Sequence, residues 1–281
     1  MKYCLFTIAI ATLASCASAK NPVQKEETIR PGEVRLLEFD IQQNEDVRFY
    51  CGEKELKIQK QKNKVSAVVI ESYFSDLKPF TCYLKEENHN LYEIFFKVVD
   101  KEYKAEQLRV DPKRIRLSPK DQKRANAEQL VLNKIYASSL DTFLFKTPFQ
   151  SPMNSHITSV YGTKRVYNKR KKGQHLGTDF RAAIGDKVPT TNAGKVVFAG
   201  DLFYTGGTVI IDHGMDIFSV YGHLSKPLVE AGQMVKRGDV IGLSGNTGRT
   251  SGPHLHWGVK VQGQYIDGFA LIEESKKLFK E

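Results

Sequence analysis

Short apolar or alternating runs dominate the chain between residues 20 and 110. Four of them have the length and the β-branched and aromatic content that are typical of strands, namely 34–39, 47–51, 65–70 and 92–99. Turn-forming segments such as Arg30-Pro31-Gly32 separate these runs. We therefore predict a small β-sandwich-like domain over residues 20–112. It contains no catalytic constellation, and His89 is expected to be a solvated residue in a polar turn.

A helical pattern follows this region. Ser118 is a candidate N-cap, because Pro119 stands at the first helical position and Asp121 at the third. Apolar residues continue at roughly helical spacing to about Ser139. The pattern predicts a helix over 119–139 within a connector of residues 113–148.

The last part of the chain, residues 149–281, again favours strands. Short β-like runs alternate with glycines at 195–200, 208–211, 240–243 and 256–261. Tight turns between short strands are typical of an antiparallel β domain. The predicted fold class is therefore mainly β: a small sandwich, a connecting helix and an antiparallel carboxy-terminal sheet.

Charge narrows the choice of partners. The 281 residues carry a formal net charge of +10, which favours anionic partners such as nucleic acid, anionic lipid or an acidic wall polymer. No nucleic-acid-reading motif is present, so we expect no nucleic-acid partner. The basic run 164–165 with 169–172 is expected to be a solvated loop. Its alternative role is salt-sensitive attraction to an anionic wall polymer.

Residues 1–19 have the features of a targeting segment. Lys2 precedes an apolar run over 5–13 that is too short to span a bilayer. Ala17-Ser18-Ala19 is one candidate cleavage site, and Leu13-Ala14-Ser15-Cys16 resembles a lipobox in which Cys16 becomes lipidated. Either alternative predicts export, with the product periplasmic, anchored to the outer membrane through Cys16, or secreted. No other segment is long and apolar enough to span a membrane.

Export changes the interpretation of the four cysteines. Cys4 is removed with the targeting segment, and Cys16 is removed or lipidated. Cys51 and Cys82 remain as an even pair in an oxidising compartment, which predicts a disulfide. Closing a loop of about 30 residues stabilises a domain by roughly 3–4 kcal/mol in the chain-entropy account. The alternative is two buried free thiols.

The candidate chemistry lies in three short stretches that hold four of the seven histidines. His254 and His256 are two apart, so in a strand both side chains point to one face and Trp257 points into the core. His175 and Asp179 are four apart and can share a face of an extended segment. Gly177, which lies between His175 and Asp179, keeps that space free of side-chain bulk.

Zinc sites in enzymes usually use three protein ligands and leave one position open. His175, Asp179 and one of the pair His254 and His256 supply such a set. His223 lies near a predicted strand end and adds a free imidazole, which peptide hydrolysis uses for proton transfer and oxyanion stabilisation. Because no glutamate follows a ligand histidine as in His-Glu-x-x-His helices, we expect the general base to be a histidine.

The segment from about 159 to 268 resembles the M23 peptidases, the lysostaphin/LytM-type zinc endopeptidases. The matching stretches, in chain order, are Ser159-Val160-Tyr161-Gly162, His175-x-Gly177-x-Asp179-Phe180, Gly185-Asp186-x-Val188, Gly194-x-Val196, Ile210-Ile211-Asp212-His213-Gly214, Tyr221-Gly222-His223-Leu224-Ser225, Val235-Lys236-Arg237-Gly238-Asp239 and Gly245-Asn246-Thr247-Gly248-Arg249-Thr250-Ser251-Gly252-Pro253-His254-Leu255-His256. One departure is Thr190-Thr191, where alanine is common in the family.

The resemblance implies roles for five residues. His175, Asp179 and His256 match the zinc ligands, and His223 and His254 match the two catalytic histidines. It also implies Zn²⁺ as the cofactor and stem peptides of peptidoglycan as the substrate. The predicted function is that of a zinc endopeptidase that hydrolyses peptide crosslinks of peptidoglycan.

The other histidines are expected to have structural or surface roles, and one other fold with a His-x-His motif can be compared. His213 is expected to be structural or to lie behind the ligands, and His156 to be a surface or packing residue. A cupin is disfavoured because the glutamate that should follow its second histidine is missing, since Trp257-Gly258-Val259-Lys260-Val261 stands there.

One alternative function stays open from the sequence. It is a non-catalytic or autoinhibited LytM-type regulator of amidases, whose groove is blocked by the helix 119–139 or by the amino-terminal domain. The bond cleaved, either a D-Ala–diaminopimelate crosslink or a glycine bridge, is also open. So are the choice between the cell's own wall and a foreign one, and the oligomeric state.

Overall fold

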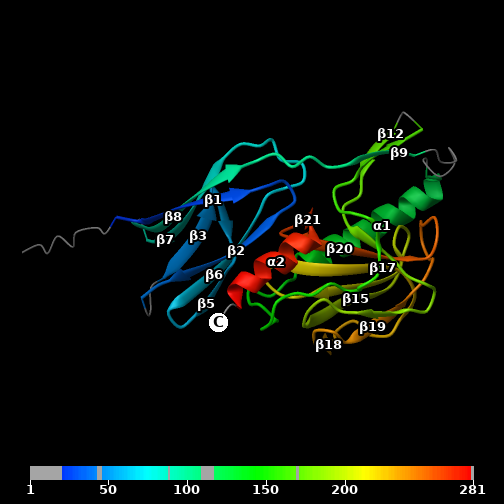
Figure 1. Cartoon of the computed structure of the whole chain (residues 1–281). Helices are drawn as coiled ribbons and strands as arrows, with labels where there is room; N and C mark the ends of the chain where they lie inside the picture. Colours follow the sequence, from blue (N-terminus) through cyan, green and yellow to red (C-terminus); the bar gives the residue numbers. More distant parts are fainter. Residues whose placement is uncertain (1–20, 43–45, 88, 109–116, 169–170, 280–281) are drawn as a thin grey trace, which may run out of the picture.

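The computed structural model describes residues 21–279 except 43–45, 88, 109–116 and 169–170 (Figure 1). The targeting segment 1–19, with Cys16 and both candidate cleavage sites, lies outside the described residues. Within them, many strands and two helices confirm the mainly β class. Neither of these helices is long and apolar enough to cross a membrane.

The amino-terminal strands form two sheets. One has the order β1-β8-β7-β3-β4 and the other the order β2-β6-β5. Their bounds are β1 (Val23–Ile29), β2 (Val34–Asp40), β3 (Val47–Cys51), β4 (Lys54–Leu56), β5 (Ile58–Gln61), β6 (Lys64–Ile70), β7 (Phe80–Glu86) and β8 (His89–Val98). The four predicted runs lie within β2, β3, β6 and β8 or overlap them. A shared buried cluster joins the two sheets, which agrees with the predicted small sandwich.

His89 is exposed as expected, but it is the first residue of β8 and pairs with Glu86 rather than lying in a turn. Cys51 and Cys82 stand directly opposite each other on β3 and β7, with Cα atoms 4.0 Å apart. The predicted disulfide between them is present.

Strand β6, at the centre of the sheet β2-β6-β5, is buried on both faces. On β6, Val65 and Val69 belong to the cluster between the two amino-terminal sheets, whereas Val68 belongs to the core of the carboxy-terminal sheet. This explains why Ala67 to Ile70 of β6 are all apolar instead of alternating with polar residues. On β2, Val34 and Leu36 join the carboxy-terminal core in the same way. A fragment starting near residue 149 would therefore expose part of that core.

The carboxy-terminal strands form one large sheet with the order β10-β13-β20-β17-β16-β15-β18, to which β14, β19 and β21 are attached. The bounds are β10 (Ile157–Ser159), β13 (Thr178–Arg181), β14 (Lys187–Pro189), β15 (Gly194–Leu202), β16 (Gly206–Asp212), β17 (Ile217–Pro227), β18 (Met234–Val235), β19 (Val240–Ser244), β20 (His254–Val261) and β21 (Gln264–Ile266). Every directly paired strand in it is antiparallel, as predicted.

A third sheet links the two halves of the chain. β9 (Ala105–Leu108) pairs in parallel with β11 (Lys164–Tyr167), and β11 pairs with β12 (Lys171–Gln174). β9 therefore has its strand partner beyond the predicted boundary at residue 112. The division into domains at 20–112, 113–148 and 149–281 stays a prediction.

Helix α1 (Pro119–Tyr136) begins as predicted, because Ser118 Oγ accepts a hydrogen bond of 3.1 Å from the backbone N–H of Asp121. It ends at Tyr136 rather than at Ser139. Ser139 lies beyond the helix, and its hydroxyl donates to Asp212 Oδ1 at 2.7 Å. Tyr136 packs edge-on against Phe218 of β17, which holds the end of α1 on the sheet.

Helix α2 (Gly268–Leu278) was not among the predicted elements. Asp267 caps it by accepting from the N–H of Phe269 at 3.1 Å. The helix lies between the amino-terminal sheets and the large sheet (Figure 1), and its Leu271 is fully buried in the core there. Glu274 Oε1 accepts from the N–H of Leu36, so α2 joins the two halves directly.

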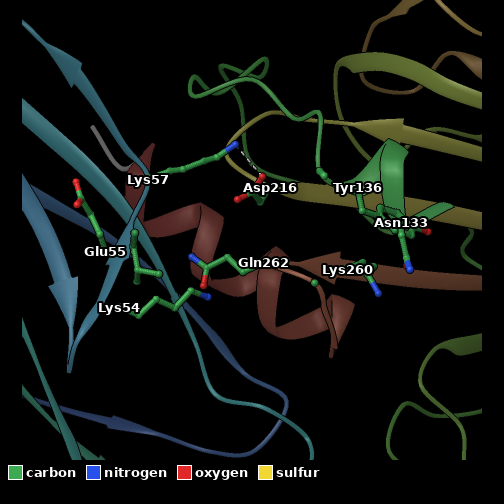
Figure 2. Close-up of a pocket in the computed structure, with 11 residues that line it drawn as sticks. Lys54, Glu55, Lys57, Asn133, Tyr136, Asp216, Lys260 and Gln262 are labelled. Carbon is green, nitrogen blue, oxygen red and sulfur yellow. Dashed lines mark ion pairs between the residues drawn. The ribbon is translucent and has the colours of Figure 1, made fainter. Parts of the chain in front are cut away.

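A cavity of about 490 Å³ lies between β4, the end of α1 and the end of β20 (Figure 2). Lys57 from the amino-terminal part pairs there with Asp216 at 3.0 Å. None of the five predicted site residues lines this cavity.

Candidate metal centre

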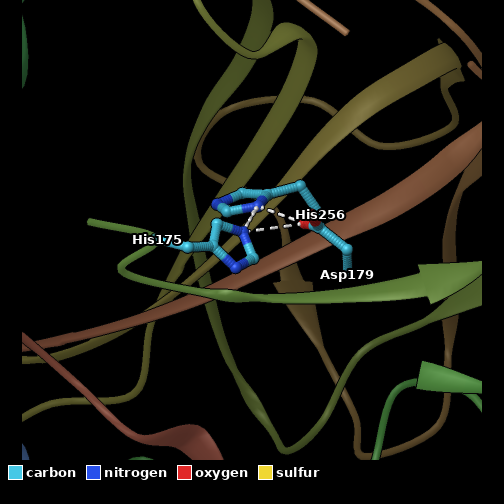
Figure 3. A group of neighbouring side chains, drawn as sticks. All are labelled: His175, Asp179 and His256. Carbon is cyan, nitrogen blue, oxygen red and sulfur yellow. Dashed lines mark hydrogen bonds and ion pairs between the residues drawn. The ribbon is translucent and has the colours of Figure 1, made fainter. Parts of the chain in front are cut away.

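The structure brings His175, Asp179 and His256 together (Figure 3). Asp179 Oδ1 lies 3.0 Å from His175 Nε2 and 2.8 Å from His256 Nδ1. The two imidazole nitrogens are 3.2 Å apart. One donor atom from each residue therefore faces a single point, which is the arrangement that a metal ion requires.

Strand pairing positions two of these three side chains. β13 and β20 are antiparallel neighbours, and their register places Asp179 directly opposite His256. Side chains of directly opposed residues project to the same face of a sheet. On β20, Leu255 and Trp257 are buried on the other face, so the predicted alternation around His256 is confirmed.

His175 reaches the group by a different route from the one predicted. It does not share one extended segment with Asp179, because β12 ends at Gln174 and β13 begins at Thr178. Its backbone is fixed instead by bonds to the segment after β10: the N–H of His175 donates to Thr163 O at 2.9 Å, and the N–H of Gly162 donates to His175 O at 2.7 Å.

Gly177 lies at the closest approach between these segments. A Cβ atom there would lie 2.4 Å from His256 Cε1 and 2.9 Å from the carbonyl oxygen of Trp257. This agrees with the prediction that glycine at 177 keeps space free beside the metal.

The donor set fits zinc. Two imidazole nitrogens and one carboxylate oxygen are a ligand set typical of catalytic zinc, with a fourth position left for water or substrate. His175 Nδ1 lies 3.0 Å from Ser159 Oγ and 3.3 Å from Val160 O, so its N–H is engaged there and Nε2 carries the free lone pair. Burial acts to raise the pKa of Asp179, but the adjacent imidazoles of His175 and His256 outweigh it and hold that pKa well below its usual range.

His223 and His254 form a second pair beside the metal group. Their ring centroids are 4.6 Å apart, and the His223 centroid is 5.9 Å from that of His256. His223 Nδ1 donates to Thr247 O at 2.7 Å, and His254 Nδ1 donates to the Gly252 carbonyl at 2.8 Å. These bonds fix the tautomers, so both Nε2 atoms are free to accept a proton. Burial lowers the pKa of His223 to about 4, although its bond to Thr247 opposes this.

His223 owes its position to an irregularity in β17. It lies within the strand rather than near its end, and its φ is +61°. The register between β16 and β17 shifts just there. In a regular strand His223 would face the same side as Tyr221, which is fully buried in the core. The irregularity turns His223 toward His254 instead.

The other histidines agree with their predicted roles. His213 is fully buried; its Nδ1 donates to Ala193 O at 2.7 Å, and its Nε2 lies 2.7 Å from Ser219 Oγ. Burial lowers its pKa to about 4, although its bond to Ala193 opposes this. His156 is exposed. Thr191, the family departure, donates its N–H to Tyr221 Oη at 2.8 Å and belongs to the core packing.

One residue of the site was predicted wrongly. Arg165 was assigned to a solvated basic loop, but its side chain is largely buried and its Nη2 lies 3.9 Å from Asp179 Oδ2. From a run of lysines and arginines alone, one cannot predict which side chain is buried and which ones are solvated.

Fold and site together are those of an antiparallel β-sheet domain with a His-Asp-His group that could hold a metal ion. The family model "Peptidase family M23" matches residues 173–268, which contain all five predicted site residues. This match of residues 173–268 to the M23 family model confirms the resemblance.

Two curated relatives illustrate the match. Peptidoglycan DD-endopeptidase ShyA of Vibrio cholerae is 45% identical over 112 residues, which are 40% of this chain and 26% of ShyA. DD-carboxypeptidase/endopeptidase Mpg of Neisseria meningitidis is 37% identical over 135 residues, 48% of this chain and 29% of Mpg. The chain thus matches only about a quarter of the length of these relatives.

A solved structure extends the likeness beyond the peptidase region. The crystal structure of a putative M23 peptidase from Pseudomonas aeruginosa superimposes with a TM-score of 0.64 at 27% identity. The superposition covers 91% of this chain and 97% of that one. The amino-terminal sheets therefore share in the similarity.

Proposed function

We propose that this protein is a zinc-dependent endopeptidase that hydrolyses peptide crosslinks of peptidoglycan. The observation that carries the proposal is the convergence of five side chains in an M23 domain, with no position of the set replaced. The similarity to ShyA, a peptidoglycan DD-endopeptidase, and to Mpg, a DD-carboxypeptidase/endopeptidase, supports the choice of peptidoglycan peptides as the substrate class.

In the proposed site His175, Asp179 and His256 hold the metal. Zinc, when bound, lowers the pKa of water and polarises the scissile carbonyl. The protein contributes fixed donor directions: His175 is held through Nδ1 and Asp179 through its strand register. Both constraints reduce the reorganisation that binding requires.

His223 and His254 are the proposed catalytic residues. Each imidazole is held through Nδ1 by a backbone carbonyl, which leaves Nε2 as a proton acceptor. A neutral His223 at neutral pH follows from its lowered pKa, so it can take a proton from water. Returning that proton to the leaving amine completes peptide hydrolysis, and the second imidazole stabilises the negative charge that develops on the carbonyl oxygen.

An extracytoplasmic location follows from the substrate class. The proposed lipid anchor at Cys16 is tested by labelling cells with a radioactive fatty acid and isolating this protein. Absence of label, or label that persists in a Cys16→Ser variant, would contradict the anchor without affecting the proposed chemistry.

The proposed activity is tested on purified sacculi with the full chain loaded with zinc. We expect new peptide ends, with loss of most turnover but not of zinc in His223→Ala, and loss of both in His175→Ala. If zinc-loaded protein releases no peptide ends but stimulates an amidase, the result would instead support the alternative function of a LytM-type regulator of amidases.

A further inference from the structure

Arg165 of β11 is a largely buried cation beside the proposed metal group. Its side chain is 22% exposed, and its Nη2 donates to Ser159 Oγ at 2.8 Å. The same nitrogen lies 3.9 Å from Asp179 Oδ2. A cation near a bound divalent ion is unfavourable unless a carboxylate lies between them, which is where Asp179 stands.

The two oxygens of Asp179 have separate partners. Oδ1 faces His175 and His256, whereas Oδ2 faces Arg165. Attraction between the guanidinium and Oδ2 therefore opposes a rotation of the carboxylate that would withdraw Oδ1 from the metal position.

Ser159 extends this effect to a second ligand. Its Oγ accepts from Arg165 and lies 3.0 Å from His175 Nδ1. With Nε2 of His175 turned to the metal position, Nδ1 carries the hydrogen and donates to that hydroxyl oxygen or to Val160 O. Arg165 thus acts on two of the three ligands, on one directly and on the other through Ser159.

Arg165 is itself held from the other side. β9 pairs in parallel with β11 and places Glu106 at the register position of Arg165. Glu106 Oε2 lies 3.9 Å from Arg165 Nε, an atom that is buried and makes no hydrogen bond within the described part of the chain. The segment that leaves the amino-terminal sheets is therefore in contact with the side chain behind the metal group.

We propose that Arg165 is a positioning residue of the metal centre, which holds Asp179 by Oδ2 and His175 through Ser159. The inference rests on the proposed function only in that the group binds zinc. Ligand-supporting partners of this kind change metal affinity by about 10–100-fold when removed.

The test measures zinc affinity of the full chain by competition with a chromophoric chelator, without any hydrolysis assay. Arg165→Ala is expected to lower the affinity by about 10–100-fold. Arg165→Lys is expected to restore part of it, because lysine keeps the charge but cannot make both contacts. Lys164→Ala is the matched control: it removes one positive charge from the exposed neighbour on the same strand and should change the affinity less than about twofold.

Two further measurements, on Ser159 variants and on Co²⁺-loaded protein, test whether Arg165 acts through the metal ligands. Ser159→Ala should weaken zinc binding, and combining it with Arg165→Ala should cost less than the sum, since the residues act through one network. The visible absorption of the Co²⁺-loaded protein should change in Arg165→Ala, in Ser159→Ala and, more weakly, in Arg165→Lys, but not in Lys164→Ala. If Arg165→Ala does not fold, the Arg165→Lys and Ser159→Ala variants carry the comparison.

Wild-type zinc affinity together with wild-type Co²⁺ absorption in Arg165→Ala would overturn the proposal. Failure of the wild-type chain to bind zinc would instead contradict the proposed function. Zinc binding without hydrolysis by the wild type would contradict the endopeptidase and leave the positioning role to be decided by the variants.

Discussion

Gly177→Ala is the smallest change that should disturb the metal group. The added Cβ would lie 2.4 Å from His256 Cε1 and 2.7 Å from His256 Nε2, whereas ordinary contacts begin at 3.4 Å. Relief therefore requires a shift of about 1 Å, the scale at which a misplaced group costs about 100-fold in rate. The backbone oxygen of Trp257, 2.9 Å from the same Cβ, blocks movement of the glycine toward β20.

The group that must shift is the imidazole ring of His256, a proposed zinc ligand. Cε1 is bonded to Nδ1 in the same ring, and Nδ1 lies 2.8 Å from Asp179 Oδ1. If the ring moves, we expect zinc affinity to fall by at least about tenfold, and turnover by about 100-fold. If the protein keeps the ring in place, the overpacking should appear as about 1–3 kcal/mol in the free energy of unfolding.

Zinc affinity is measured by chelator competition, turnover on a crosslinked muropeptide, and unfolding in urea. Gly200→Ala is the matched control, because the atom nearest to its added Cβ would be Phe198 Cζ at 3.2 Å. Gly177→Ala with the zinc affinity, turnover and stability of the wild type would refute the close approach on which this reasoning rests.

Three other changes separate chemistry from stability. His223→Ala should bind zinc within about threefold of wild type and lose about 100–10,000-fold in turnover, since general acid–base groups contribute about that much; an unchanged turnover would remove His223 from the mechanism. Burial lowers the pKa of His213 to about 4 in the folded protein, against 6.5 in the unfolded chain. The free energy of unfolding should therefore fall by about 3 kcal/mol as the pH drops from 6.5 to 4. His213→Asn should make the free energy of unfolding less dependent on pH over this range. Cys51→Ser with Cys82→Ser opens a loop spanning a sequence separation of 31 and should cost roughly 3–4 kcal/mol in urea unfolding, with zinc affinity unchanged.

The fold class and the ligand set could be predicted because local patterns carry them. Short apolar or alternating runs predicted the strands. The two-residue spacing of His254 and His256 predicted that both side chains lie on one face of a strand. The two-sided burial of β6 was visible in the sequence only as the consecutive apolar residues from Ala67 to Ile70. A run of that kind does not say what covers its second face, so the contact of Val68 with the carboxy-terminal core could not be predicted.

The missed features depend on tertiary structure. A positive φ such as that of His223 is uncommon for any residue other than glycine, so neither propensity nor period predicts the register shift there. His175 approaches Asp179 across a break between strands, although an even spacing suggested one strand. Helix α2 and the inward turn of Arg165 depend on partners far away in the chain: Leu36 for the helix, and Glu106 for the arginine.

The most direct test uses the full chain, one purified crosslinked muropeptide dimer and mass spectrometry. With zinc bound, the dimer should disappear and two monomers should form, their summed mass larger by one water. Protein stripped of zinc, and the His223→Ala variant with zinc bound, should leave most of the dimer intact. An intact dimer in the presence of zinc-loaded wild-type protein would contradict the proposed endopeptidase.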